Sequence, residues 1–393
     1  MKNKVKLVAI AKDEGAYLVD WIFHHLYFGF YAIDIYVNRT SDNTFEIADK
    51  LKSLEQVRFL DGDAFLKQDN KSFQTDVYFS AYQNEASSDV SHILFLDIDE
   101  FWTPANFEDE ISTCISSVGG DVISFEWFVK TDEESQFKAP FSTSNFGNRG
   151  RFVKSISSLG LQARSVQAHN IHADHADYRL ADGTPFKFNG WKNGRVSEEE
   201  LKSPLKDYFV VHRMFRSQME YLSLLARGRP SSNMRFKDNR AGYPSKNANE
   251  QWEISEETLS SYNLQRYEFI ERYQLKASID SAREFIKQRY KNVLRLIETA
   301  SREEAEFLES ALQNIDISEA LTSYASALKA LSAKPALKSN EVDTLRKVAF
   351  TISESYPRQA LMLLELAKKQ REKAPIIDSR IKELKAKLNL NAN

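Results

Sequence analysis

The pattern of apolar and polar residues changes character near residue 245. Before that point, apolar runs of strand length alternate with segments of helical period, which is typical of an α/β sheet covered by helices. We predict strands at residues 5–11, 32–37, 57–60, 92–96 and 122–127. The first helix follows the first strand, because Leu18, Trp21, Ile22 and Leu26 recur at helical spacing. These residues form one apolar face that is expected to pack on the sheet.

Two polar segments are predicted to begin helices. Asp13 stands before the first helix, where its side chain can accept hydrogen bonds from unpaired backbone N–H groups. Asn43, followed three residues later by Glu46, has the pattern of a capping box for the next helix. A further helix is predicted over residues 74–85. Strand, polar loop and helix therefore repeat along this region.

After residue 245 the chain is predicted to be helical throughout. Helices are expected at residues 278–296, 302–313, 318–331, 340–355, 357–369 and 375–388. All 13 glycines lie at or before Gly242, so the turn chemistry of the two parts differs sharply. We predict a catalytic domain over residues 1–245 and an all-α domain over residues 256–393. The helical domain is expected to serve acceptor presentation, oligomerisation or membrane-surface contact.

Composition and charge narrow the class of protein. The 393 residues are 42% hydrophobic and carry a net charge of -3, which fits a globular protein and argues against nucleic acid as a partner. Cys114 is the only cysteine, which excludes an intrachain disulfide and a cysteine-based zinc site. No stretch approaches the roughly 18 apolar residues that span a bilayer. We expect a cytoplasmic protein, with the inner face of the membrane as its alternative address.

The most informative motif is Asp97-Ile98-Asp99, directly after the strand predicted at 92–96. Ligands bind at strand ends in open α/β sheets, and Mn²⁺ or Mg²⁺ prefers carboxylate oxygens. One aspartate would contact a ribose or a metal-bound water, and the other would bind the metal that neutralises a leaving diphosphate. The alternative is a solvated acidic loop. Phe101 and Trp102 favour the first interpretation, because bulky aromatic side chains beside a metal suit a sugar face.

Several strings of residues together resemble a known enzyme family. They are 9–14, 21–25, Asn38 with Ser41 and Asp42, 96–101, Trp127 with Phe128, 154–156, His169, and His212 with Arg216, Ser217, Arg227 and Gly228. Over residues 4–230 the chain is similar to the family-2-like bacterial glycosyltransferases related to family 92. The resemblance implies a GT-A fold with a Rossmann-like mixed sheet, a nucleoside-diphosphate sugar donor, a divalent metal and inversion at the anomeric carbon. Val129 stands where that family has a glycine, so the acceptor loop is expected to differ.

The resemblance also implies roles for residues at the first two strand ends. The loop after the first strand, with Ala9, Lys12 and Glu14, would hold the nucleoside together with Asn38. Asp42 would hydrogen-bond the base or the ribose. Its alternative role is that of a helix-capping turn residue.

A histidine and a group of arginines follow the apolar run at 208–211. By the resemblance, the His212 imidazole would complete the metal shell of Asp97 and Asp99, and a core histidine is the alternative. The arginines are Arg213, Arg216, Arg227 and Arg229. Guanidinium groups bind diphosphates through paired hydrogen bonds, so Arg216 is a candidate donor ligand. A solvated basic face is the alternative for this group.

An inverting transfer requires a carboxylate that accepts the proton of the acceptor hydroxyl. The candidates are Glu126, Asp174, Asp177 and Asp182. We favour Asp177, because the order metal motif, base, histidine along the chain is usual in similar enzymes. Glu126, at the end of the fifth predicted strand, is the second choice.

Three histidines, His169, His172 and His175, suggest a zinc site, but their spacing drifts around a helix axis and no cysteine supports it. A polar loop or acceptor contact is expected there instead.

Other functions compete with glycosyl transfer. A haloacid-dehalogenase-like phosphotransferase also places Asp-x-Asp after a strand, but normally after the first one, and without a bulky residue such as Phe101. A catalytically inactive helical scaffold is a second alternative. Nucleotidyltransferases would need a glycine-rich phosphate loop after the first strand, which this chain lacks. By the resemblance, the expected partners are a nucleotide-sugar donor and a glycan or lipid-linked acceptor in surface polysaccharide synthesis. Homo-oligomers through the helical part are expected from its glycine-free composition.

Overall fold

The computed structural model describes residues 3–67, 72–85, 89–186, 194–227, 234–245, 248–332, 339–370 and 374–388. Contacts divide the chain into two compact units. The first consists of Met1–Ser217 and Lys246–Ile286, and the second of Gln218–Ser245 and Lys287–Asn393. Each unit therefore contains one segment from the other side of the sequence boundary predicted between residues 245 and 256. Separate folding of the helical region stays a prediction.

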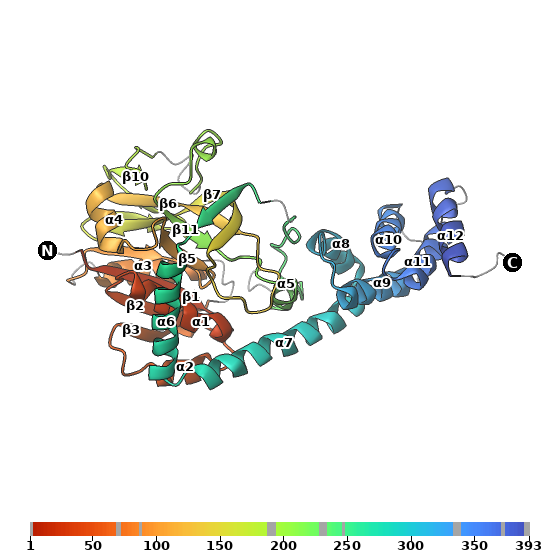
Figure 1. Cartoon of the computed structure of the whole chain (residues 1–393), viewed down its shortest axis with the longest axis horizontal. Helices are drawn as coiled ribbons and strands as arrows, with labels where there is room; N and C mark the ends of the chain where they lie inside the picture. The colour runs from red at the N-terminus through yellow and green to blue at the C-terminus, as the bar shows by residue number, and fades with distance from the viewer. Residues whose placement is uncertain are drawn as a thin grey trace. The chain divides into compact units, whose positions relative to one another are not determined.

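One half of the main sheet is parallel and follows the predicted strands closely (Figure 1). Its order is β3 (Val57–Asp61), β2 (Ala32–Val37), β1 (Val5–Ala11) and β4 (His92–Phe95). Such strands are nearly continuous in apolar residues, because a parallel sheet is covered on both faces. Their carboxyl ends lie at one edge, which gathers the polar loops after Ala11, Val37, Asp61 and Phe95.

The other half is mixed and was only partly predicted. The long strand β7 (Ser144–Ser158) lies antiparallel between β4 and β6 (Val122–Lys130), so β6 ends at the same edge as β4. The start of β6 pairs with β10 (Tyr178–Leu180), and its end pairs with β11 (Tyr208–His212). The remaining partners are β5 (Glu100–Pro104) on β11, β12 (Glu250–Glu253) on β7, and a separate hairpin of β8 (Ala163–Val166) and β9 (Ile171–Ala173).

Helices cover this sheet. They are α1 (Gly15–Tyr27), α2 (Thr44–Lys50), α3 (Phe73–Glu85), α4 (Ile111–Val118) and α6 (Glu256–Arg272), with short 3-10 turns at Asp63–Phe65 and Glu200–Lys202. The apolar face predicted for the first helix is buried at Leu18, Trp21 and Ile22 and partly buried at Leu26, and α6 packs beside α1 (Figure 1). His24 on α1 is fully buried between the Tyr262 hydroxyl at 3.1 Å and the Trp102 carbonyl oxygen at 2.8 Å.

The capping prediction for Asp13 is wrong. Asp13 has a φ of 52° and accepts a hydrogen bond from the Ser41 backbone N–H at 2.7 Å, so its carboxylate points to the second loop. Asp42 takes the predicted role instead, accepting from the Gly15 N–H at 2.8 Å at the start of α1. A residue distant in sequence therefore caps the helix, which local pattern alone does not reveal.

The capping box predicted for α2 is also absent. Asn43 is the residue before the helix but makes no side-chain cap, and its amide donates to the Ser278 carbonyl oxygen at 2.8 Å. Glu46 accepts from the Ser278 hydroxyl at 2.6 Å. Both side chains thus fasten α2 to the start of α7 (Lys276–Glu298).

The second unit is built from helices. Those after residue 300 lie close to the predicted ones, whereas the short helix at Gln218–Leu225 was not predicted. The helices are α5 (Gln218–Leu225), α8 (Arg302–Ala311), α9 (Ser318–Ser332), α10 (Ser339–Ile352), α11 (Pro357–Lys369) and α12 (Pro375–Lys387). A capping box between Ser301 and Glu304 starts α8, and Arg235 pairs with Glu304 at 2.6 Å. The structure confirms the predicted fold class, a mixed α/β sheet of the Rossmann-like type expected for GT-A, followed by an all-α region.

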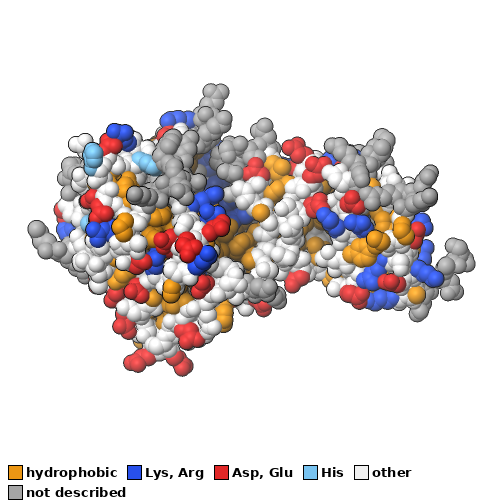
Figure 2. All heavy atoms as spheres, turned by 90° about the horizontal axis from the view of Figure 1, so that it is seen from above, with side chains coloured by type: hydrophobic (Ala, Val, Ile, Leu, Met, Phe, Trp, Pro, Cys, Tyr) orange, Lys and Arg blue, Asp and Glu red, His pale blue; other side chains and the backbone are white. Residues whose placement is uncertain are grey.

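Acidic and basic side chains are interspersed on the face seen in Figure 2, as expected from the nearly balanced charge. Among the described helices, none is both long and apolar enough to cross a membrane.

Candidate active site

The acidic segment Asp97–Glu100 forms a tight turn between β4 and β5. The Asp97 N–H donates to a Glu100 carboxylate oxygen at 2.8 Å, and the Glu100 N–H donates to the Asp97 carbonyl oxygen at 3.0 Å. The Glu100 side chain is fully buried, whereas those of Asp97 and Asp99 are 43% and 20% exposed. The turn therefore presents the two aspartates and keeps the glutamate inside.

A fully buried lysine pairs with two of the carboxylates of this turn. The Lys154 Nζ on β7 lies 2.9 Å from the Glu100 carboxylate and 3.2 Å from that of Asp97. Burial would lower the pKa of Lys154, but Asp97 and Glu100 outweigh it and leave that pKa raised. Burial raises the pKa of Glu100 to about 7, against the opposing effect of Lys154. Lys154 therefore fixes the direction of the Asp97 carboxylate.

His212 approaches the second aspartate from the neighbouring strand. Pairing of β11 with β5 sets His212 beside Glu100, and its Nε2 lies 3.6 Å from an Asp99 carboxylate oxygen. The Trp127 ring packs against the imidazole, with the ring centroids 4.3 Å apart. The His212 Nδ1 is buried and has no hydrogen-bond partner among the described residues. The predicted pair of Asp99 and His212 is thus brought together.

Aromatic residues form a wall next to His212. Trp127 also contacts His169, and Phe152 stacks on His169 with centroids 4.7 Å apart. Burial and the charge of Lys154 lower the pKa of His169 to about 4, so this imidazole is neutral at physiological pH. Of these residues, Phe152 had no motif to mark it in the sequence.

The loops after β1 and β2 are joined by hydrogen bonds. One Asp42 carboxylate oxygen accepts from the Gly15 N–H, and the other accepts from the Thr44 N–H at 3.0 Å. The Asn38 N–H donates to the Ala11 carbonyl oxygen at 3.0 Å, and Ala9 is fully buried on β1. Asp42 therefore has the capping role that is the alternative prediction from the sequence. These residues build the loop pair, and their contact with a nucleoside stays a prediction.

Arg216 lies at the start of α1, beside two of the predicted donor-binding residues. Its guanidinium is 3.7 Å from the Glu14 carboxylate and stacks 3.4 Å from the Tyr17 ring centroid. It is 2% exposed, which argues against a solvated basic face. Lys12, in the same loop, is partly buried. The structure thus brings Lys12, Glu14 and Arg216 to one strand end.

The other arginines differ. Arg213 is buried and donates to the Glu133 carboxylate at 2.6 Å. Arg227 ends a described segment, and Gly228 and Arg229 lie outside the described residues.

The two preferred general bases are not brought to this edge. Asp177 precedes β10, and its carbonyl oxygen accepts from the Val122 N–H at the start of β6, whereas His212 pairs with Val129 near the end. Seven residues of strand correspond to roughly 20 Å. Its carboxylate is bound to Arg179 at 2.7 Å. The structure therefore contradicts the placement of Asp177 near Asp97 and Asp99.

Glu126 is no better placed as a proton acceptor. Its side chain is fully buried and paired with the buried Arg149. Burial raises the pKa of Glu126, while Arg149 opposes the shift. The lesser candidates lie nearer the surface: Asp174 is 52% exposed beside Arg164, and Asp182 is 41% exposed beside Lys206. Glu126, held in a buried ion pair, is not free to take a proton from an acceptor hydroxyl.

The three-histidine run is not a metal site. His172 lies on β9, and His169 is held by its Nδ1 at 3.0 Å from the Val153 carbonyl oxygen. Across the described parts of the chain, no three side chains of the His, Cys, Asp and Glu types are grouped to hold a metal ion. The predicted three-residue set of Asp97, Asp99 and His212 is therefore not assembled, because Lys154 engages Asp97.

Asp99 and His212 by themselves fit a divalent cation. Two neighbouring ligands of an octahedral Mg²⁺ lie about 3 Å apart, and such sites often use only one or two protein ligands together with substrate phosphates. The observed 3.6 Å between the His212 Nε2 and the Asp99 oxygen is close to that spacing.

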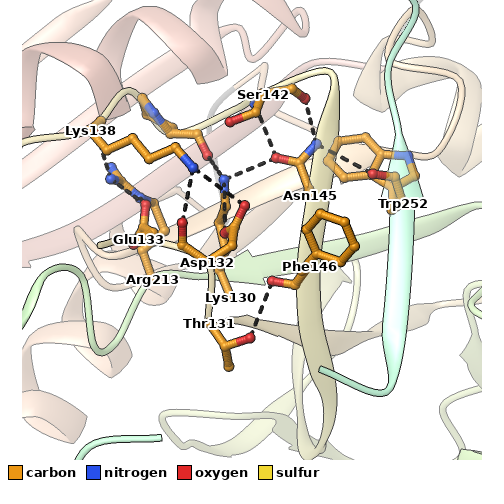
Figure 3. A network of polar contacts seen from close by, with 11 residues as sticks. Lys130, Thr131, Asp132, Glu133, Lys138, Ser142, Asn145, Phe146, Arg213 and Trp252 are labelled. Carbon is orange, nitrogen blue, oxygen red and sulfur yellow. Dashed lines mark hydrogen bonds and ion pairs between the residues drawn. The ribbon is translucent and has the colours of Figure 1, made fainter. Parts of the chain in front are cut away.

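A buried network ties the loop after β6 to this site (Figure 3). The Arg213 N–H donates to the Asp99 carbonyl oxygen at 2.8 Å, and its guanidinium reaches Glu133 and the Lys138 carbonyl oxygen. Lys130, fully buried at the end of β6, donates to the Asn145 side chain at 2.9 Å. Burial lowers the pKa of Lys130 to about 8.

Comparison with known proteins gives little help. No family model matches the chain, and no curated protein matches it. Solved structures that match include the inositol-1-phosphate CTP transferase from T. maritima, with 10% identity, a TM-score of 0.22, and coverage of 40% of this chain and 71% of that one.

TarS from S. aureus matches with 10% identity and a TM-score of 0.29 over 97% of this chain and 54% of TarS, so the chain spans about half of that protein. The structure of TarS residues 1–349 matches with 10% identity and a TM-score of 0.25, over 98% of this chain and 91% of that one. At TM-scores this low, function has to be argued from the site itself.

Proposed function

We propose that this chain is a glycosyltransferase that moves a sugar from a nucleoside-diphosphate donor to a glycan or lipid-linked acceptor. The observation that carries the proposal is the turn at Asp97–Glu100. It sits where β4 ends, with Asp99 facing His212 and with Asp97 held by Lys154. This edge also carries the loops after β1 and β2, and ligands of open α/β sheets bind at such an edge.

The donor would lie across the ends of β1 and β4. The joined loops around Asp13 and Asp42 are ordered before any ligand arrives, which reduces the entropy lost on binding. Arg216 would provide a guanidinium for the diphosphate, since it lies beside the loop after β1, 3.7 Å from the Glu14 carboxylate. Asp97, oriented by Lys154, would accept a hydrogen bond from a ribose hydroxyl.

A divalent cation, Mn²⁺ or Mg²⁺, is part of the proposal, with Asp99 and His212 as its protein ligands. When bound, it would supply positive charge to the diphosphate that leaves. Trp127 would hold the His212 ring in place and keep water from that side. Two further parts of the proposal rest only on the resemblance in sequence. They are inversion at the anomeric carbon and a role in surface polysaccharide synthesis. Contact with the inner face of the membrane is proposed as one role of the glycine-free helical part.

Donor binding tests the proposal directly. Thermal unfolding is followed with UDP-, GDP-, CMP- and dTDP-sugars, each with and without Mn²⁺, because a ligand of the folded state raises the melting temperature. At least one nucleotide sugar is expected to raise it, and only when the metal is present. Asp99→Asn should lose the shift, whereas Asp49→Asn, which changes an exposed aspartate on α2, should keep it. A panel without any shift would refute the proposal.

A further inference from the structure

An open hollow of about 790 Å³ lies at the carboxyl end of β6, within the first unit. Its walls include Asp132, Glu134, Ser135, Lys138, Phe146 and Asn249. Most of these come from the loop that joins β6 to β7, and Phe146 lies on β7 itself (Figure 3). None of these residues has a role in the donor site proposed above.

The hollow is connected to the metal segment by the backbone and by Arg213. His212 pairs with Val129 on β6, and the hollow begins at Thr131, the residue directly after the end of that strand. Arg213 follows His212 and binds both the Asp99 carbonyl oxygen at 2.8 Å and the Lys138 carbonyl oxygen at 2.7 Å. A molecule in the hollow would therefore lie next to the segment that handles the donor.

The base of the hollow is rigid. Lys130 donates to the Pro140 carbonyl oxygen at 2.8 Å and to the Asn145 side chain at 2.9 Å, which closes the loop at both ends. Thr131 N–H donates to the Phe146 carbonyl oxygen at 3.0 Å. A ligand would meet a preformed surface, so little conformational entropy would be lost on binding.

The lining favours a molecule with many hydroxyl groups. Phe146 is 38% exposed, which is unusual for so large an apolar side chain, and its ring offers a face for the C–H groups of a sugar. Ser135, Asn249 and the carboxylates can exchange hydrogen bonds with hydroxyl groups. Asp132 lies 3.5 Å from both Lys130 and Lys138, so the charges here are nearly balanced and no surplus of cations is available to bind a phosphate-rich chain.

We propose that this hollow is the acceptor subsite and that it takes an uncharged glycan chain, with a sugar ring stacked on Phe146. The inference rests on the proposed function, because an acceptor needs a donor site beside it. It adds the class of acceptor and the residues that select it. It also identifies the loop at residues 131–138 as a determinant of specificity.

Binding is measured directly, so that the test does not depend on turnover. Neutral oligosaccharides of glucose, galactose and N-acetylglucosamine, and a poly(glycerol phosphate) chain, are titrated by saturation-transfer NMR and calorimetry. Phe146→Ala should weaken glycan binding roughly tenfold, and Phe146→Trp should restore it, because the aromatic face is what counts. Phe45→Ala, which removes a phenylalanine that is 62% exposed on α2, is the matched control and should bind as the parent does.

The outcomes separate the two proposals. Glycan binding that depends on Phe146, in a protein that neither binds nor hydrolyses nucleotide sugars, would refute the donor function and leave the subsite standing. Donor hydrolysis with glycan binding unaffected by Phe146→Ala and Asn249→Ala would overturn the subsite alone. Tighter binding of poly(glycerol phosphate) than of every oligosaccharide would overturn the class of acceptor.

Discussion

Two pairs of aspartates stand at the same edge of the sheet, and they are satisfied in different ways. Asp13 and Asp42 accept hydrogen bonds mainly from backbone N–H groups and hydroxyls of the adjoining loops. Asp97 and Asp99 instead face the side chains of Lys154 and His212. Backbone partners cannot leave without breaking the loop, whereas side-chain partners can rearrange or share a ligand. We infer that the first pair shapes the site and the second pair acts in it.

The largest effect should come from Asp99→Asn. Loss of one negative ligand would remove stabilisation worth several kcal/mol in the transition state, so turnover should fall by roughly 10³-fold. Turnover is measured by release of the nucleoside diphosphate, and the melting temperature should stay near that of the parent. Full activity in excess EDTA would contradict metal-dependent transfer.

The next effect concerns Lys154. Replacing it with methionine leaves the fully buried Glu100 without its cation, and breaking a buried pair typically costs about 3–5 kcal/mol. Urea unfolding gives the free energy of unfolding of Lys154→Met and of the double variant with Glu100→Gln. The double variant should recover part of the loss. A cost below about 1 kcal/mol would mean that the pair behaves as an exposed one.

Lys130 extends the comparison to the two buried lysines. Unlike Lys154, it has mostly neutral partners, and burial lowers its pKa from 10.5 to about 8. Between those two values the unfolded chain holds a proton that the folded chain has lost, so stability should rise with pH, by at most about 1.4 kcal/mol per unit. Below pH 8 the contribution of Lys130 is constant.

The measurement is the difference in unfolding free energy between the parent and Lys130→Met from pH 7 to pH 11. Equal slopes for the two proteins across that window would show that Lys130 keeps an ordinary pKa.

The smallest effect is expected at Asp42. Asp42→Ala removes the acceptor for the Gly15 N–H at the start of α1, and lost caps cost about 1 kcal/mol. Asp42→Asn keeps one acceptor oxygen and should cost less. Thermal unfolding and nucleotide-sugar titration are compared for both variants. If Asp42→Asn keeps its stability but loses donor affinity, Asp42 contacts the nucleoside, and the division between the two pairs is wrong.

The helices after residue 300 and the parallel strands were predictable because their signals are local. Helix α11, predicted at 357–369, is observed at Pro357–Lys369, since its spacing and its initial proline are contained in the segment. The mixed half of the sheet depends on contacts between distant residues. Strand β10 pairs with the start of β6 and β11 pairs with its end. The sequence of neither strand indicates this pairing.

The same distinction explains the site. Asp99 and His212 were predictable as a pair from the motif and the resemblance, and the structure brings them together. Asp177 was predicted as the base from its position between the metal motif and His212 along the chain. That order does not determine at which end of a strand the residue lies. The role of Lys154 was not predictable, because nothing in the segment around it indicates that Asp97 and Glu100 lie beside its Nζ.

In the loop after β6, Lys130 binds the carbonyl oxygen of Pro140 and Arg213 binds that of Lys138, while residues 134–136 are exposed. Such a segment can change its sequence without disturbing the core. Exchange of these three positions offers a route to transferases with altered acceptors, in which the scaffold and the donor chemistry are inherited unchanged. Directed libraries at Glu134, Ser135 and Gln136 would explore that freedom at little risk to folding.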